Sequence, residues 1–151
     1  MPAPDPHTIL EALSHAIAGN PQRGLELIQP IVDAGPRSTY ALLGALAETA
    51  SKDVRDANGP GTLYGLDVQS PDGPADVDLL PPHLKFAARF VTAWANRDQD
   101  TAAALFWAVA ERSDRSAEDL ADAITAVFAM AAAVAEYEVI KQRRNRAEES
   151  R

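Results

Sequence analysis

The chain has 151 residues, enough for one domain with its own core, and 46% hydrophobic and 24% charged residues are typical of a globular protein. The absence of cysteine excludes disulfides, thiolate metal sites and cysteine nucleophiles, and the three histidines are too scattered for a zinc site. The formal net charge is −8, with −11 in residues 1–140 and +3 in residues 141–151, so the body lacks the basic surface that general nucleic-acid binding requires.

Apolar residues at helical spacing predict three helices in the first part of the chain: at about residues 6–18, from residue 21 to the break at Gly35, and at about residues 38–57. Asp5 and Asn20 are expected to cap the first two helices, because a proline follows each at the first helical position. Pro30 lies inside the second helix and is expected to kink it or end it early.

The stretch from residue 58 to residue 82 is an insert of different composition, with five prolines and four glycines that forbid a continuous helix. Residues 62–68 and 76–80 are expected to form a short hairpin around Pro71-Asp72-Gly73. Its aspartates do not follow the EF-hand pattern of ligands, so neither a calcium site nor any other metal site is expected.

Three more helices are predicted after the insert, at about residues 82–96, 98–112 and from 116 onward. The last apolar stripe continues to Ile140, and the polar run "KQRRNR" is expected to end the helix. A helix of roughly 30 residues is about 45 Å long, more than a compact body of this size requires. Its last two turns are therefore expected to project.

The sequence thus predicts a single all-α domain over residues 1–151, a six-helix bundle with one three-helix unit on each side of the insert. The units would span residues 6–57 and 82–146, with a tail at 147–151. A shift of 78 residues pairs apolar positions of the two units, for example Leu27 with Leu105 and Ile28 with Phe106. Two interpretations remain open: a duplication, and two sets of helical stripes that coincide by chance.

The helix pairs loosely resemble tetratricopeptide repeats, which place glycine, small, aromatic and proline residues at set distances. The positions that fit are Gly19, Gly24, Ile28, Ile31 and Pro36 in the first unit, and Asp98, Ala103, Trp107 and Ala110 in the second. The sequence departs from the pattern where the repeat has Trp, Leu and Tyr, and it does not sustain the 34-residue period. The resemblance implies that the helix pairs stack on each other. It does not assign the chain to the family.

Three aromatic residues are candidates for an interaction surface. Trp94 and Trp107 flank the turn between the fourth and fifth predicted helices, and Trp107 lies beside the core position Phe106. An aromatic residue off the main stripe either covers the insert, where Tyr64 is its natural contact, or anchors a partner.

The other candidates lie on the last helix: Tyr137, Lys141, Arg143, Arg144 and Arg146. The cations favour the C-terminal end of a helix because they complement its dipole, and the alternative is contact with phosphates, an acidic partner or a second copy. The alanine-rich face of this helix permits close packing, so a homodimer through residues 116–146 is also expected.

The function expected from these features is that of a non-enzymatic, cytoplasmic protein-interaction or assembly factor without a cofactor. The chain start "MPAPDPHT" lacks signal-peptide features, and the 13-residue apolar run at 123–135 is too short to span a bilayer, so no membrane partner is expected. One alternative is a small-molecule or metal-dependent enzyme, in which several of Asp98, Asp100, Glu111 and Asp122 would converge between helices. The other is a nucleic-acid-associated regulator that uses residues 141–146.

Overall fold

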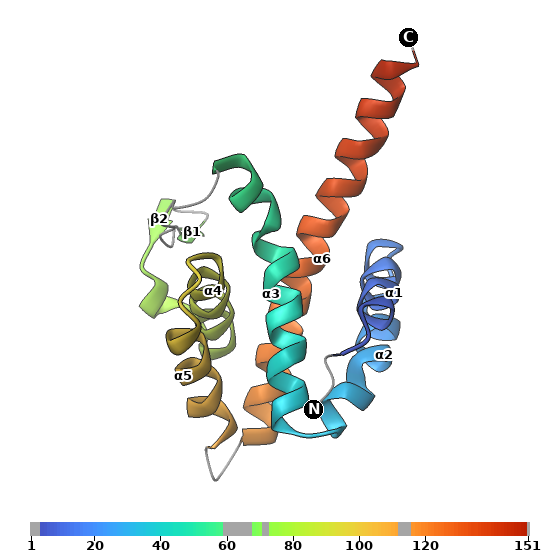
Figure 1. Ribbon diagram of the computed structural model, residues 1–151. Helices are drawn as coiled ribbons and strands as arrows, with labels where there is room; N and C mark the ends of the chain where they lie inside the picture. Colours follow the sequence, from blue (N-terminus) through green and yellow to red (C-terminus); the bar gives the residue numbers. More distant parts are fainter. Residues whose placement is uncertain (1–3, 59–67, 71–72, 112–115, 151) are drawn as a thin grey trace.

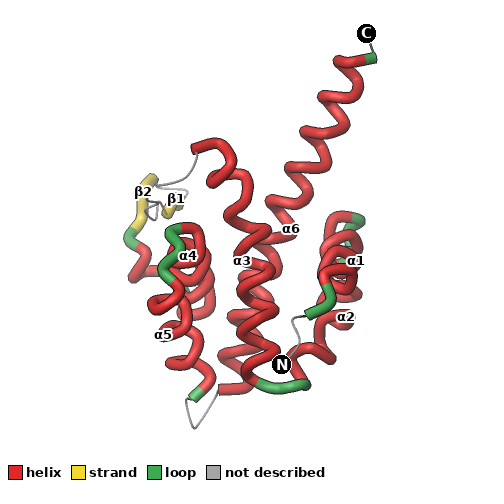
Figure 2. The backbone as a smooth tube through the Cα atoms, in the orientation of Figure 1, coloured by secondary structure: helices red, strands yellow, loops and turns green. Residues whose placement is uncertain are grey.

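The computed structural model describes residues 4–58, 68–70, 73–111 and 116–150. Over these residues the protein consists of six α-helices with one short antiparallel β-ribbon beside them (Figures 1 and 2). The helices are α1 (Pro6–Ile17), α2 (Pro21–Asp33), α3 (Pro36–Asn58), α4 (Pro82–Ala95), α5 (Gln99–Ala110) and α6 (Ser116–Glu149). The predicted fold class, an all-α six-helix bundle, is confirmed.

The starts of three helices follow directly from side-chain caps. The carboxylate of Asp5 accepts a hydrogen bond from the backbone N–H of His7, and the side chain of Asn20 accepts one from the N–H of Arg23. Asp98 caps α5 in the same way, as an acceptor for Thr101. Each cap satisfies a backbone donor that the first turn of a helix leaves without a partner.

The predicted end of one helix, α6, is wrong, whereas α2 ends where the break at Gly35 predicts. α2 continues past Pro30 to Asp33, because the missing proline N–H removes one hydrogen bond and the flanking turns keep theirs. α6 does not stop at the basic run but continues through it to Glu149, 34 residues in all. Arg and Lys are good helix formers, and no glycine or proline follows to end the helix.

The core lies around the central pair α3 and α6, which run side by side in the same direction (Figure 1). α1 and α2 cover one side of this pair, and α4 and α5 cover the other (Figure 2). The largest fully buried side chains come from all six helices except α1: Ile28, Thr39, Leu42, Leu43, Leu46, Phe90, Phe106, Val127 and Phe128. Burying one of the large apolar side chains among them contributes roughly 1.5–3 kcal/mol.

The α1–α2 and α4–α5 turns have the same geometry, 78 residues apart. In the first, Gly19 has a φ of +92°, and the N–H of Asn20 donates to the carbonyl of His15 at 2.8 Å. In the second, Arg97 has a φ of +60°, and the N–H of Asp98 donates to the carbonyl of Ala93 at 2.9 Å. Both are Schellman turns that close one helix, and the next residue caps the following helix.

The insert contains a hairpin, but its second strand is not where the sequence analysis placed it. β1 (Val68–Ser70) pairs antiparallel with β2 (Gly73–Ala75), which confirms a hairpin, while residues 71–72 lie outside the described residues. The predicted strand at 76–80 is wrong, because Val77–Leu79 forms a short 3-10 helix. Asp76 accepts from the N–H of Asp78 at 2.9 Å and so starts this helix, while the rest of the predicted first strand lies outside the described residues.

Candidate functional site

The far end of α6 is the most distinctive surface of the molecule. Ala131 is the last residue of α6 that is buried, and from Ile140 to Ser150 every residue is exposed. This part of the helix extends beyond the body as a single rod (Figure 1). This segment continues a helix that the body already holds, so it needs no nucleation of its own, but tertiary packing no longer stabilises it.

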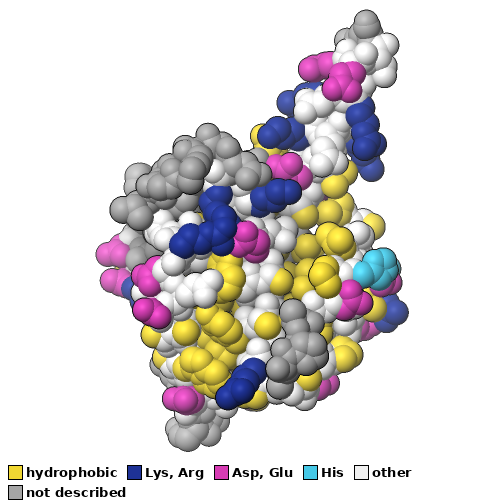
Figure 3. Space-filling model, viewed as in Figure 1, with side chains coloured by type: hydrophobic (Ala, Val, Ile, Leu, Met, Phe, Trp, Pro, Cys, Tyr) yellow, Lys and Arg dark blue, Asp and Glu magenta, His cyan; other side chains and the backbone are white. Residues whose placement is uncertain are grey.

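Apolar side chains continue onto the projecting segment, where the body no longer covers them. Tyr137 is 55% exposed and Ile140 is 48% exposed, and Met130 stands at the edge of the body with 36% exposure. Figure 3 shows hydrophobic side chains at the place where the projecting helix leaves the body. Tyr137 is one of the candidates that the sequence predicts. The exposure of Met130 and Ile140 was not predicted, although they lie at three- and four-residue intervals along the same helical stripe.

The four basic candidates do not form one face. Lys141, Arg143, Arg144 and Arg146 are all exposed on α6. At 100° per residue, Lys141 and Arg144 lie together on one side of the helix, and Arg143 and Arg146 lie on another. Figure 3 accordingly shows basic side chains on both sides of the projecting helix, with acidic side chains beyond them toward its end. Such a distribution offers no continuous basic track for a phosphate backbone.

Trp94 lies in the contact between α3 and α4, so only part of its indole is open to a partner. The ring is stacked on Phe90 at 5.9 Å and meets the edge of Tyr40 at 6.3 Å. It also lies over Gly44, where a Cβ would come within 2.6 Å of the indole. Burial in this aromatic group raises the pKa of Tyr40 above its ordinary value, because the phenolate is less well solvated there.

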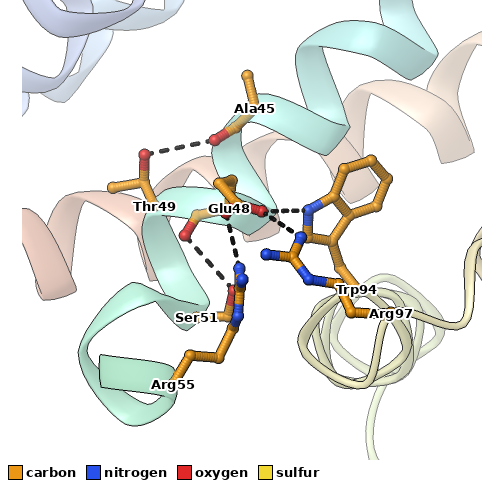
Figure 4. Close-up of polar contacts among 7 residues, drawn as sticks. All are labelled: Ala45, Glu48, Thr49, Ser51, Arg55, Trp94 and Arg97. Carbon is orange, nitrogen blue, oxygen red and sulfur yellow. Dashed lines mark hydrogen bonds and ion pairs between the residues drawn. The ribbon is translucent and has the colours of Figure 1, made fainter. Parts of the chain in front are cut away.

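The indole N–H of Trp94 belongs to a polar cluster centred on Glu48 of α3 (Figure 4). It donates to Glu48 Oε2 at 2.7 Å, and Arg97 Nη1 donates to the same oxygen at 3.2 Å. Arg55 Nη1 donates to the other carboxylate oxygen, Oε1, at 2.7 Å. The carboxylate is about half exposed, so each ion pair contributes at most about 1 kcal/mol.

The Glu48 cluster joins α3 to the end of α4, and sequence reasoning missed it. Glu48 lies 46 residues before Trp94 and 49 before Arg97, so no local spacing indicates the contact. Arg97 adopts the left-handed backbone conformation, which costs a residue with a Cβ about 1–2 kcal/mol. Its ion pair with Glu48 offsets part of that cost. The cluster therefore serves the packing of α3 against the end of α4.

The remaining aromatic candidates stay predictions. Trp107 is partly buried on α5, with its ring 5.1 Å from that of Phe106 in an edge arrangement. Tyr64, its expected contact, lies outside the described residues.

The acids of the enzyme alternative do not converge. Asp98 and Glu111 are the N-cap and C-cap of α5, so a 12-residue helix of about 18 Å separates them. The hydroxyl and the backbone N–H of Thr101 donate to Asp98 and hold the pKa of its carboxyl below its ordinary value, which is the role of a cap. Asp122 instead lines a shallow depression between α4 and α6.

That depression brings His83 near Asp119 and Asp122, beside Phe86 and Val109. Among the residues that the structure describes, no group of three or more His, Asp or Glu side chains is arranged to hold a metal ion. A second groove runs between α2 and the first turns of α6 and is mainly apolar, with Leu25, Ile28, Val32, Leu120 and Ile124 in its lining.

α6 is long and apolar enough to cross a membrane by length and composition alone. It contains an 18-residue window of mean hydropathy 1.7, of which 33% is buried in the body, and this window is longer than the 13-residue apolar run at 123–135. A core helix passes the same test, and α6 does contribute to the core. Its buried residues pack against neighbouring helices: Ala123, Ile124, Ala126, Val127, Phe128 and Ala131. That the protein has no membrane partner remains a prediction.

Comparison with protein-family models, with curated proteins and with solved structures finds no match to the chain.

Proposed function

We propose that this protein is a non-enzymatic interaction or assembly factor of the cytoplasm, which binds a protein partner through the projecting part of α6. One observation carries the proposal: α6 continues beyond the body with Tyr137 and Ile140 about half exposed. Exposed large apolar side chains on a rigid helix, rimmed by charged residues, are typical of binding by a helix face.

The architecture supports the same proposal, because it favours a duplicated three-helix unit. The Schellman turns at Gly19 and Arg97 and the caps at Asn20 and Asp98 coincide under the 78-residue shift. Buried Ile28 and Phe106 coincide under the same shift. In this interpretation the helix pairs α1–α2 and α4–α5 are equivalent and resemble stacked repeats, an arrangement that builds extended binding surfaces.

The proposal is tested by photo-crosslinking from the projecting segment in a lysate of the source cells, with nuclease present. A photoreactive phenylalanine analogue replaces Tyr137, and a control variant carries it at Ala104, an exposed position of α5. We expect protein adducts of defined mass from position 137 and fewer from position 104. Absence of any protein adduct at position 137 contradicts the proposal, whatever the control yields.

A further inference from the structure

The exposed apolar residues of α6 form a stripe with the spacing of a helix–helix seam. Met130, Ala133, Tyr137 and Ile140 follow one another at intervals of three, four and three residues, which places them on one side of the helix. All four are exposed. Residues at three- and four-residue intervals are neighbours on a helix surface, so this side presents a continuous apolar strip about 15 Å long.

The strip prolongs a side of α6 that lies beside another helix nearer its N-terminal end. There the same side carries Asp119 and Asp122, which line the depression between α4 and α6, and the buried Ala126. Above Met130 no helix among the described parts of the chain takes the place of α4. The strip can therefore pack against a second helix, with the usual distance of about 8–10 Å between the two helix axes.

We infer that the occupant is a second copy of α6, packed antiparallel so that the two projecting segments lie along each other. This inference rests on the proposed function and names its partner. In this two-fold arrangement Tyr137 lies opposite Ile140 of the second copy, and Met130 lies opposite Ala147. Ala133 faces Arg144, whose aliphatic stem covers the small side chain while the guanidinium reaches water.

Charge complementarity supports this register. Glu136 and Arg143 flank the strip on the same side, and within the described residues neither has an ion-pair partner in its own chain. The antiparallel register that pairs Tyr137 with Ile140 also brings Glu136 of each copy beside Arg143 of the other. The two-fold axis forms this pair twice, so each charge that is exposed in the single chain gains an opposite charge in the dimer.

A parallel pair fits less well. It would place Arg144 of each copy against Arg144 of the other, where the two charges repel. It would also place Ala133 opposite Ala133, and these small side chains would leave space between the helices unfilled. It would also bring both bodies to the same end, where α4 occupies the side of α6 that faces the second copy. The antiparallel pair puts the bodies at opposite ends and avoids this collision.

The test is the mass of the purified full chain by light scattering over a range of concentration, from about 5 to about 500 µM, since an interface smaller than the standard size is expected to be weak. The wild-type mass is expected to rise from 16.1 kDa toward twice that value. E136R and R143E each place like charges together and are expected to weaken the dimer about tenfold. The double variant E136R/R143E restores opposite charges and is expected to recover dimerisation to within about threefold of wild type.

The double variant also distinguishes the two directions of packing. In a parallel pair Glu136 would face Lys141 and Arg143 would face Glu148, so exchanging both charges would add two repulsions and give the weakest dimer. R146E is the matched control, because Arg146 lies off the strip and its reversal leaves the dimer unchanged. Thermal unfolding of each variant, expected to match wild type because all three positions are exposed, separates a lost interface from a lost fold.

Two outcomes overturn the inference. One is a monomer at every concentration, and the other is a double variant weaker than both single variants. If the wild type stays monomeric while position 137 crosslinks to a different protein, the inference fails and the proposed function stands. If the protein is monomeric and position 137 crosslinks to no protein, both fail.

Discussion

Gly24 provides a sharp test of how closely the helices pack, because replacing it with alanine changes the free energy of unfolding in two opposite ways. It lies inside α2, where replacing an interior glycine with alanine ordinarily stabilises a helix by about 1 kcal/mol. From the sequence alone, Gly24→Ala is thus expected to stabilise the protein.

The structure reverses that expectation. A Cβ on Gly24 would press into the backbone carbonyl of Ala12 in α1 and come within 2.8 Å of Cζ of Phe128 in α6. A carbonyl cannot rotate away as a side chain can, and Phe128 is 2% exposed. Overpacking of this kind costs about 1–3 kcal/mol, and the backbone contact favours the upper end of that range. After the gain in helix propensity, the net loss is about 1–2 kcal/mol, or about 2–8 °C in Tm for a chain of this size.

Urea unfolding followed by circular dichroism at 222 nm measures the free energy of unfolding. Ala104→Gly, on the exposed side of α5, calibrates the propensity term and is expected to lose about 1 kcal/mol. Gly44→Ala is a second comparison, since its Cβ meets the indole side chain of Trp94 and no backbone atom, and it is expected to cost less than Gly24→Ala. A Gly24→Ala variant as stable as wild type, or more stable, would refute the packing described for α1, α2 and α6.

Three further predictions concern the turn between α4 and α5. Trp94→Phe keeps an aromatic side chain but removes the donor to Glu48 and some of the contact with Gly44, and a loss of at least about 1 kcal/mol is expected in urea unfolding. No loss would mean that the hydrogen bond contributes nothing. Arg97→Gly relieves about 1–2 kcal/mol of strain from the left-handed backbone and loses an exposed ion pair worth at most about 1 kcal/mol. The free energy of unfolding should therefore stay the same or rise. A lower free energy of unfolding would contradict backbone strain at Arg97. Asp98 has a depressed pKa, so its contribution to stability is present above the ordinary carboxyl pKa and is lost as pH falls through the depressed value. Thr101→Val should raise the pKa of Asp98 in an NMR titration. An unchanged titration midpoint would show that the Thr101 hydroxyl is not the main cause of the lowered pKa.

Local signals in the sequence located the helices correctly for a physical reason. Caps such as Asp5 and Asn20 act on backbone groups within three residues, so the pattern that predicts them also contains their partners. The apolar stripes likewise predicted the buried positions Leu42 and Leu46. The errors occurred where no local rule decides, at the second strand of the hairpin and at the end of α6.

By itself the sequence therefore determined the class of the fold, the number of helices and most of their boundaries, because these depend on interactions within a few residues along the chain. Only the tertiary structure decided which apolar residues stay uncovered. Tyr137 and Ile140 continue a helical stripe, and they are exposed because the body ends below them. The structure alone also joined Glu48 to Trp94 and Arg97, since contacts between distant residues depend on how the helices pack and carry no signal in local spacing.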